Sequence, residues 1–250
     1  MRTIILLLFI GFHITVKAQN TRIIDFNSIG WYNAFITKKI TKKWSAHLEY
    51  QWRRTNVVTD WQQSLLRAGL NYRVNKKLMF RAGYGWIETF PYGDIPLQAA
   101  GKTFTEHRSF QAIFLDDTLG PLDIQHRFML EQRWVGRYLN PGISIEDDYV
   151  FTNRLRYMLR LQIRLGKKRM EDRTFYAAFY DEIFIQFGNN VQENIFDQNR
   201  ICGLLGYRIN KTFRLEAGYL SQFVMFGREI KGNNVLQKNN GLIVNTYFNF

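Results

Sequence analysis

Residues 154–165 read Arg154-Leu155-Arg156-Tyr157-Met158-Leu159-Arg160-Leu161-Gln162-Ile163-Arg164-Leu165, and this alternation decides the fold. In an extended strand successive side chains point to opposite faces, so this strand has one apolar face and one face with a row of arginines. Such a row is costly in an apolar core, whereas a strand between lipid and a polar lumen suits both faces. The stretch therefore predicts one strand of a transmembrane β-barrel.

The same alternation recurs along the chain, most clearly in residues 44–53. One face there consists of Trp44, Ala46, Leu48, Tyr50 and Trp52, and the other of Ser45, His47, Glu49, Gln51 and Arg53. Strands are predicted at about 29–37, 44–54, 63–74, 78–88, 104–115, 122–134, 150–165, 174–186, 198–209, 213–225 and 240–250. The expected fold class is all-β, an antiparallel transmembrane β-barrel.

The expected strand number follows from the directions of the first and last strands. The last strand, 240–250, must end in the periplasm, so the first of the strands above runs in the same direction. Bacterial single-chain barrels have even strand numbers. We therefore expect about twelve strands, with Arg22–Ser28 as a short additional strand or, alternatively, residues 20–28 as a plug in the lumen.

The connections between the predicted strands alternate in length. Short basic turns are expected at 38–43, 75–77, 166–173 and 210–212, and longer polar loops around 55–62, 89–103, 135–149, 187–197 and 227–239. Because outer-membrane barrels have short periplasmic turns and longer external loops, we expect the basic turns to face the periplasm. Interfacial girdles are expected from Trp31, Trp44, Trp52, Trp86 and Trp134.

The two ends of the chain indicate export to the outer membrane of a Gram-negative cell. Met1–Ala18 has the parts of a cleaved signal peptide: a charged start, an apolar run and a small-residue cleavage site. Residues 19–250 are then expected to form a single barrel domain. The last strand ends in an aromatic residue, and Tyr247, Phe248 and Phe250 are expected to present it to the barrel-assembly machinery.

The formal net charge of the chain is +13, and removal of Arg2 and Lys17 with the signal peptide lowers it by 2. A basic chain favours nucleic acid, anionic lipid or an acidic solute as a partner. Since an exported protein rarely meets nucleic acid, we expect outer-membrane lipids and a small anionic solute. Cys202 is the only cysteine, so no internal disulfide is expected, and its side chain should pack inside its strand.

Charged residues on the polar strand faces form the predicted functional site, a charge network in the lumen. Its members are Glu49, Glu106, Arg108, Arg127, Glu131, Arg133, Arg154, Arg156, Arg160, Glu182, Arg200 and Glu216. In one interpretation Glu49, Glu131, Glu182 and Glu216 pair with Arg127, Arg133, Arg156 and Arg200 on neighbouring strands, which fills the lumen and fixes the register. In the other, arginines exceed their acidic partners and line a path for anions, as charged rings do in selective pores.

A membrane-embedded enzyme that modifies lipid or peptide is the alternative function. It would need a nucleophile and a base in contact, and the candidates are His47, His107 and His126 with Ser45, Ser64, Ser109, Ser144 and Ser221. Their spacing identifies no pair, so no catalytic residue is predicted. The sequence has no P-loop, dinucleotide-binding or HExxH motif, and we expect neither a metal nor a cofactor.

Three features depart from the simple alternation. The predicted strands 104–115 and 174–186 have apolar or aromatic residues on both faces, so either the lumen wall is partly apolar there or the strands are bulged. His126 falls on an otherwise apolar face. Because a histidine that faces lipid is costly, we expect at this position either a local bulge or a strand register that differs from the simple alternation.

Several motifs of the chain resemble an uncharacterised outer-membrane β-barrel family, domain-of-unknown-function family 2490. They are Glu106-His107-Arg108, His126-Arg127, Glu131-Gln132-Arg133 and Gln198-Asn199-Arg200, together with the terminal strand. The resemblance covers essentially the whole mature chain. It implies an outer-membrane barrel and brings no known activity.

Overall fold

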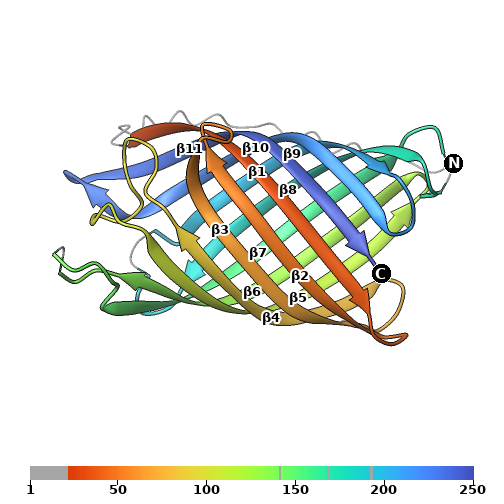
Figure 1. Ribbon diagram of the computed structural model, residues 1–250, viewed down its shortest axis with the longest axis horizontal. Helices are drawn as coiled ribbons and strands as arrows, with labels where there is room; N and C mark the ends of the chain where they lie inside the picture. The colour runs from red at the N-terminus through yellow and green to blue at the C-terminus, as the bar shows by residue number, and fades with distance from the viewer. Residues whose placement is uncertain (1–21, 141, 168, 192–193) are drawn as a thin grey trace, which may run out of the picture.

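The described residues form a closed β-barrel (Figure 1). The computed structural model describes residues 22–140, 142–167, 169–191 and 194–250. The predicted signal peptide, residues 1–18, therefore lies outside the described residues. No helix in the described part of the chain is long and apolar enough to cross a membrane.

Eleven strands make up the described barrel wall. They are β1 (Ile23–Lys39), β2 (Trp44–Thr55), β3 (Asp60–Arg73), β4 (Leu78–Thr89), β5 (Phe104–Leu119), β6 (Leu122–Arg137), β7 (Asp148–Arg164), β8 (Thr174–Phe187), β9 (Phe196–Arg208), β10 (Phe213–Ile230) and β11 (Asn233–Asn249). Each strand from β1 to β10 pairs antiparallel with the next one in the chain. The predicted all-β barrel is confirmed.

The barrel closes through a parallel pairing of β1 with β11. When an odd number of strands is connected by hairpins, the first and last strands point the same way, so their pairing must be parallel. The pairing runs from Ile23 opposite Val235 to Thr37 opposite Asn249. Residues 23–28, expected as a separate strand or a plug, are thus the first part of β1, and eleven strands close the described barrel.

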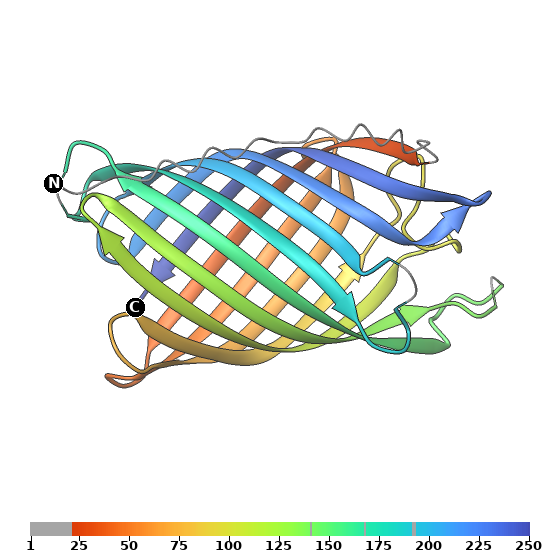
Figure 2. The same cartoon turned by 180° about the vertical axis from the view of Figure 1, so that it is seen from behind.

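The two ends of the barrel differ in their connections, as Figure 2 shows from behind. The turn end holds Phe250 and the connections 40–43, 74–77, 120–121, 165–173 and 209–212, whereas the loop end carries the loops 90–103, 138–147 and 188–195. Two expected loops are shorter than predicted: 55–62 contracts to a turn at 56–59, and 227–239 is mostly strand. β10 and β11 continue as a two-stranded hairpin to a tight turn at Lys231 and Gly232. Water can hydrate polar side chains on both faces of such a hairpin, so these residues can form strands without an apolar outer face.

The outer face of the barrel is apolar, as the alternation predicts. Outward side chains along the strands include Leu48, Leu66, Phe80, Ile113, Leu155, Ile183 and Leu242, which are each 38–45% exposed. Trp44, Trp86 and Trp134 are also exposed on this face. Trp31, expected among these aromatic residues, is only 2% exposed, because it lies opposite the inward Arg53 of β2 and alternates with the outward Tyr32.

His126 lies on the outer face without a bulge. β6 keeps its register with both neighbouring strands at this position, so both expected alternatives are wrong. The Nδ1 atom of His126 lies 2.9 Å from the hydroxyl oxygen of Tyr157, and the two rings stack. A hydrogen bond on the outer face therefore satisfies the histidine.

The lumen wall is partly apolar where both faces of a predicted strand are apolar. One interior cluster consists of Met79, Phe110, Ala112, Phe114 and Met129. A second consists of Ile29, Trp31, Tyr176, Ala178, Cys202, Leu204, Leu220 and Ile243. The first alternative for residues 104–115 and 174–186 is confirmed, although β8 also shifts register against β9 between Phe184 and Ile185. Cys202, on β9, is buried in this second interior cluster, as expected.

We predict that Gly206→Ala destabilises the barrel. A Cβ atom at position 206 would lie 2.1 Å from Cζ of Tyr176, whose side chain is fully buried and has no room to move away. Overpacking of this kind costs about 1–3 kcal/mol. Urea unfolding, followed by the gel mobility of unheated samples, measures the change. Gly203→Ala is the matched control on the same strand, because no heavy atom lies within 4 Å of the added Cβ; equal midpoints for the two variants would contradict the prediction.

Candidate functional site in the barrel lumen

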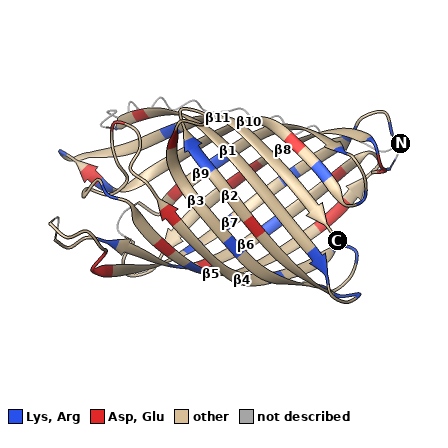
Figure 3. Cartoon of the chain, viewed as in Figure 1, with Lys and Arg blue, Asp and Glu red and all other residues tan. Residues whose placement is uncertain are grey.

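All members of the predicted charge network point into the lumen. The arginines that are buried in the lumen or line its cavities are Arg53, Arg67, Arg81, Arg108, Arg127, Arg133, Arg154, Arg156, Arg160, Arg200 and Arg214, and the carboxylates are Asp25, Glu49, Glu106, Asp116, Asp117, Asp123, Glu131, Glu182, Asp197 and Glu216. Figure 3 shows charged segments along the strands as well as at the ends of the barrel. Among the described lumen residues, arginines therefore outnumber carboxylates.

Glu131 is the centre of the network, and none of its surface is exposed. Its Oε2 atom accepts hydrogen bonds from Arg154 at 2.8 and 2.6 Å, and its Oε1 atom accepts one from Arg156 at 2.8 Å. Nitrogens of Arg67 and Arg108 lie 3.6 and 3.9 Å from Oε1. One carboxylate on β6 thus holds arginines from β3, β5 and β7.

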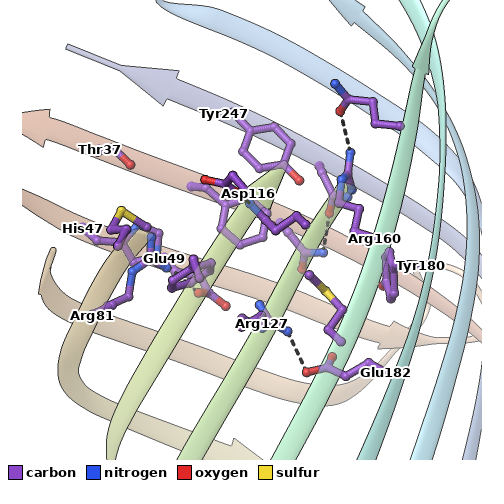
Figure 4. A pocket seen from close by; sticks show the side chains of 18 of the residues that line it. Thr37, His47, Glu49, Arg81, Asp116, Arg127, Arg160, Tyr180, Glu182 and Tyr247 are labelled. Carbon is purple, nitrogen blue, oxygen red and sulfur yellow. Dashed lines mark hydrogen bonds and ion pairs between the residues drawn. The ribbon is translucent and has the colours of Figure 1, made fainter. Parts of the chain in front are cut away.

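The network continues to β8 and β9. Arg154 also donates to Asp197 at 2.7 Å, and Arg156 donates to Glu182 at 2.9 Å. Glu182 accepts a further bond from Arg127 at 2.6 Å, the pair drawn in Figure 4. The Arg156–Glu182 bond joins the neighbouring strands β7 and β8, whereas the Arg154–Asp197 and Arg127–Glu182 bonds connect β7 to β9 and β6 to β8, which are not neighbours in the barrel wall.

A second cluster surrounds Glu216 near the turn end. Arg160 donates to its Oε1 atom at 2.6 Å, and the Tyr176 hydroxyl donates to the same atom at 2.8 Å. The Tyr247 hydroxyl donates to Oε2 at 3.0 Å. Arg160 therefore crosses the lumen from β7 to β10, and Figure 4 shows Arg160 and Tyr247 in the same part of the cavity.

Further ion pairs of the lumen lie within one strand or join neighbouring strands. Arg67 on β3 donates to Glu49 on β2 at 2.9 Å. Glu106 on β5 accepts bonds from Arg108 at 2.9 Å and from Arg133 of β6 at 3.1 Å. These pairs lie side by side in the barrel wall and match the ladder interpretation locally.

Three lumen arginines have no carboxylate oxygen within 4.0 Å in the part of the chain that the structure describes: Arg53, Arg81 and Arg200. Arg81 instead donates to Asn71 at 2.6 Å. Arg200, which was expected to pair with a glutamate, donates to Gln198 Oε1 at 3.1 and 2.8 Å. That expectation is wrong, because the nearby carboxylate of Glu182 is already occupied by other arginines.

Aromatic rings complete a layer of side chains across the lumen, which we call the waist. Its members are Trp31, Arg53, Arg67, Arg108, Glu131, Arg154, Arg156, Phe184 and Arg200. The guanidinium carbons of Arg156 and Arg200 lie 4.4 and 4.5 Å from the ring centre of Phe184. Arg200 and Arg53 likewise lie 4.8 and 3.9 Å from the ring of Trp31. Cation–π contacts thus extend the layer from β7 to β1 and β2.

Two cavities meet at the waist. The turn-end cavity has a volume of about 480 Å³, and its lining includes Trp31, Arg67 and Arg156. The loop-end cavity has a volume of about 290 Å³, and its lining includes Arg53 and Arg154. Arg200 lines both cavities, so it marks the point where they approach each other.

The loop 90–103 covers part of the loop-end cavity. The Tyr92 hydroxyl donates to Gln237 of β11 at 2.6 Å, and Arg228 of β10 donates to the carbonyl oxygen of Pro96 at 2.6 Å. Burial raises the pKa of Tyr92 to about 12, so its hydroxyl stays protonated and remains a donor. The loop is therefore fixed to the opposite side of the barrel mouth.

The candidate catalytic residues lie apart. His47 is buried with Nε2 3.4 Å from Glu49, whereas His107 contacts Tyr84 on the outer face and His126 contacts Tyr157 there. No hydrogen bond joins a serine to a histidine among the described residues. The described residues thus contain no assembled serine–histidine pair, and the membrane-embedded enzyme stays a prediction.

The aromatic residues of the terminal strand divide between the two faces of the wall. Tyr247 points into the lumen towards Glu216. Phe248 stacks on Phe213 and Phe250 on the outer side, and Phe250 is 58% exposed. Only two of the three predicted residues are thus presented outward, because side chains alternate along the strand.

Sequence reasoning left Arg53, Arg67, Arg81 and Asp197 out of the predicted network. Arg53 and Arg67 share the polar face of their strands with other members, so the alternation itself is a sufficient signal for them. Asp197 was assigned to a loop, yet it is the second residue of β9 and is 7% exposed. Asp197 can be assigned to the network only when the first residue of β9 is known, and the pairing of β8 with β9 defines that residue.

The family model described as Protein of unknown function (DUF2490) matches residues 29–229 of this chain. The chain belongs to this family. For this DUF2490 protein no match is found among curated proteins. Among solved structures, the NanC porin in a rhombohedral crystal form is similar with a TM-score of 0.47 and 13% sequence identity, over 88% of this chain and 97% of that one.

We predict that Glu131→Gln is the most destabilising single change in the waist. Removing the carboxylate leaves buried arginines without their shared countercharge, and breaking a buried ion pair in this way costs about 3–5 kcal/mol. The urea midpoint of unfolding measures the effect. Asp117→Asn is the control, because Asp117 and its partner Lys77 are 63% and 72% exposed and an exposed pair contributes little. An unchanged midpoint for Glu131→Gln would show that the carboxylate does not hold the waist together.

Proposed function

We propose that this DUF2490 protein is an integral outer-membrane barrel that serves as a narrow passage for small anions. The observation that carries the proposal is the excess of arginine at the waist, where the two cavities meet. Arg53 and Arg200 are 4% and 8% exposed there and lack a carboxylate partner within 4.0 Å among the described residues. A positively charged constriction favours anions, as rings of basic side chains do in selective pores.

The outer face supports a position within a membrane. A closed barrel satisfies all backbone hydrogen bonds between strands, which is the requirement for crossing lipid with strands. Apolar side chains alternate outward along the strands, while charged side chains alternate inward. With the short connections at the turn end, we orient this end towards the periplasm and the loop end towards the cell exterior.

The ladder and the passage are compatible interpretations of the same lumen. Ion pairs around Glu131 and Glu182 occupy the waist and make it narrow. The arginines without a carboxylate partner give this narrow region a positive charge. The barrel therefore excludes large solutes by its side chains and selects small ones by the sign of their charge.

Partners outside the lumen follow from the outer face and the terminal strand. Outer-membrane lipids would surround the exposed apolar side chains. Phe248 and Phe250 lie on the outer side at the end of the chain, where the barrel-assembly machinery would meet them. A signal peptide at Met1–Ala18 would direct export.

We expect anion-preferring conductance that weakens in Arg81→Glu. Arg81 lines the turn-end cavity and donates to Asn71, so its reversal changes the lumen charge by two units without removing an ion-pair partner. Single-channel recording in a planar bilayer under a salt gradient gives the reversal potential, which should move towards cation preference. The magnitude expected is a several-fold fall in the ratio of anion to cation permeability.

Lys231→Glu is the matched control for this experiment. It makes the same change of charge at the tip of the β10–β11 hairpin, outside the lumen. Its reversal potential should equal that of the unaltered protein. A correctly inserted protein that remains silent, or equal shifts for both variants, would refute the proposed passage.

A further inference from the structure

We infer that Trp31, Arg53 and Arg200 form a binding site for a small oxyanion at the waist. The inference rests on the proposed function and deepens it, since it names the class of solute and the residues that hold it. We call these three residues the oxyanion site. The ligand class is a carboxylate or phosphate group, which share a negative charge and at least two acceptor oxygens.

The two guanidinium groups both contact one ring. The guanidinium carbons of Arg53 and Arg200 lie 3.9 and 4.8 Å from the ring centre of Trp31. Trp31 is itself fixed, because its indole nitrogen donates to Gln62 Oε1 at 2.6 Å and it is 2% exposed. Three strands, β1, β2 and β9, therefore bring two positive charges to the same indole ring.

Glutamine oxygens hold these arginines without neutralising them. Arg53 donates through Nε to Gln51 at 2.9 Å and through Nη1 to Gln63 at 2.5 Å. Arg200 donates through Nε and Nη2 to Gln198. A glutamine amide is a neutral acceptor, so each guanidinium is oriented by hydrogen bonds yet keeps its full charge.

Neither guanidinium has a carboxylate oxygen within 4.0 Å among the described residues, and both have unused donors. Like charges in a region of low dielectric repel each other strongly, and buried charges are normally paired. A guanidinium has five N–H donors; Arg53 uses three of them and Arg200 uses two in the hydrogen bonds of the described residues. An anion with two or more oxygens accepts from several of these donors at once, whereas a single-atom anion presents no fork of acceptors.

The cavities give such an anion both room and access. Arg53 lines the loop-end cavity, Trp31 lines the turn-end cavity, and Arg200 lines both. The loop-end cavity of about 290 Å³ has space for roughly ten groups the size of a water molecule. Its wall also includes Gln62, Gln186 and Gln222, whose amides suit polar atoms attached to the charged group.

Arg81 shows why the site is specific to this cluster. It also lacks a carboxylate within 4.0 Å among the described residues, but it donates to Asn71 and stacks on Phe114 without a second guanidinium at that ring. A single half-buried arginine attracts anions weakly. Two buried arginines on one ring require a countercharge.

The test is isothermal titration of the folded full chain in detergent with sodium acetate, inorganic phosphate and sodium chloride at constant ionic strength. We expect acetate or phosphate to bind at least ten-fold more tightly than chloride, and the tighter of the two identifies the charged group of the solute. Arg53→Gln and Arg200→Gln should each weaken that binding at least ten-fold. Lys231→Gln, the control, removes one positive charge at the tip of the β10–β11 hairpin outside the lumen and should stay within two-fold of the unaltered protein.

Thermal unfolding detects the same binding when its heat is too small for calorimetric titration. Without added anion, Arg53→Gln should raise the unfolding midpoint, because it removes the repulsion from Arg200. With saturating acetate or phosphate, the unaltered protein should gain more in midpoint than this variant. A merely structural arginine would give the opposite order, with the variant less stable in every salt.

The outcomes separate this inference from the proposed passage. Binding no tighter than that of chloride, or binding unchanged by Arg53→Gln and Arg200→Gln, overturns the oxyanion site even if the bilayer shows anion-selective conductance. Selective binding to a barrel that conducts no ions leaves the site in place and refutes only the passage. Both results come from the same preparation of folded protein.

Discussion

The structure depends on the need to satisfy charged side chains inside a closed barrel. Glu131 meets this need at the centre, where one carboxylate without exposed surface holds arginines of three strands. In a region of low dielectric each of these charges alone would be costly, whereas the shared carboxylate and its hydrogen bonds offset the loss of water. Glu182 and Glu216 hold further lumen arginines in the same way.

Competition for carboxylates explains the polar character of the waist. Arg156 and Arg127 both bind Glu182, so Arg200 on the next strand turns to a glutamine and to two aromatic rings. Arg53 likewise donates to a glutamine, Gln51, where a carboxylate would be the usual acceptor. The barrel thus keeps its lumen hydrogen-bonded while leaving a positive charge between two cavities, which is the basis of both proposals.

The closure of the wall depends on a second constraint, the direction of the strands. Hairpins reverse the chain at each step, so an odd number of strands brings the first and last strands together in parallel. β1 pairs with β11 over most of its length, and the terminal carbonyl of Phe250 accepts from the Lys39 amide. Within the described residues the eleven strands close the wall, and side chains project into the lumen.

Alternation along the chain is enough to assign the two faces of each strand, because an extended chain leaves only two sides for a side chain. It predicted the all-β barrel, the inward charges from Glu49 to Glu216 and the inward packing of Cys202. Which charges meet depends on the folded barrel. The bonds from Arg160 to Glu216 and from Arg154 to Asp197 cross the lumen between strands far apart in sequence, and the positions of Trp31 and Arg200 depend on the register around the whole barrel. Alternation fixes a side chain's direction, but only closure of the barrel fixes its distance to the opposite wall.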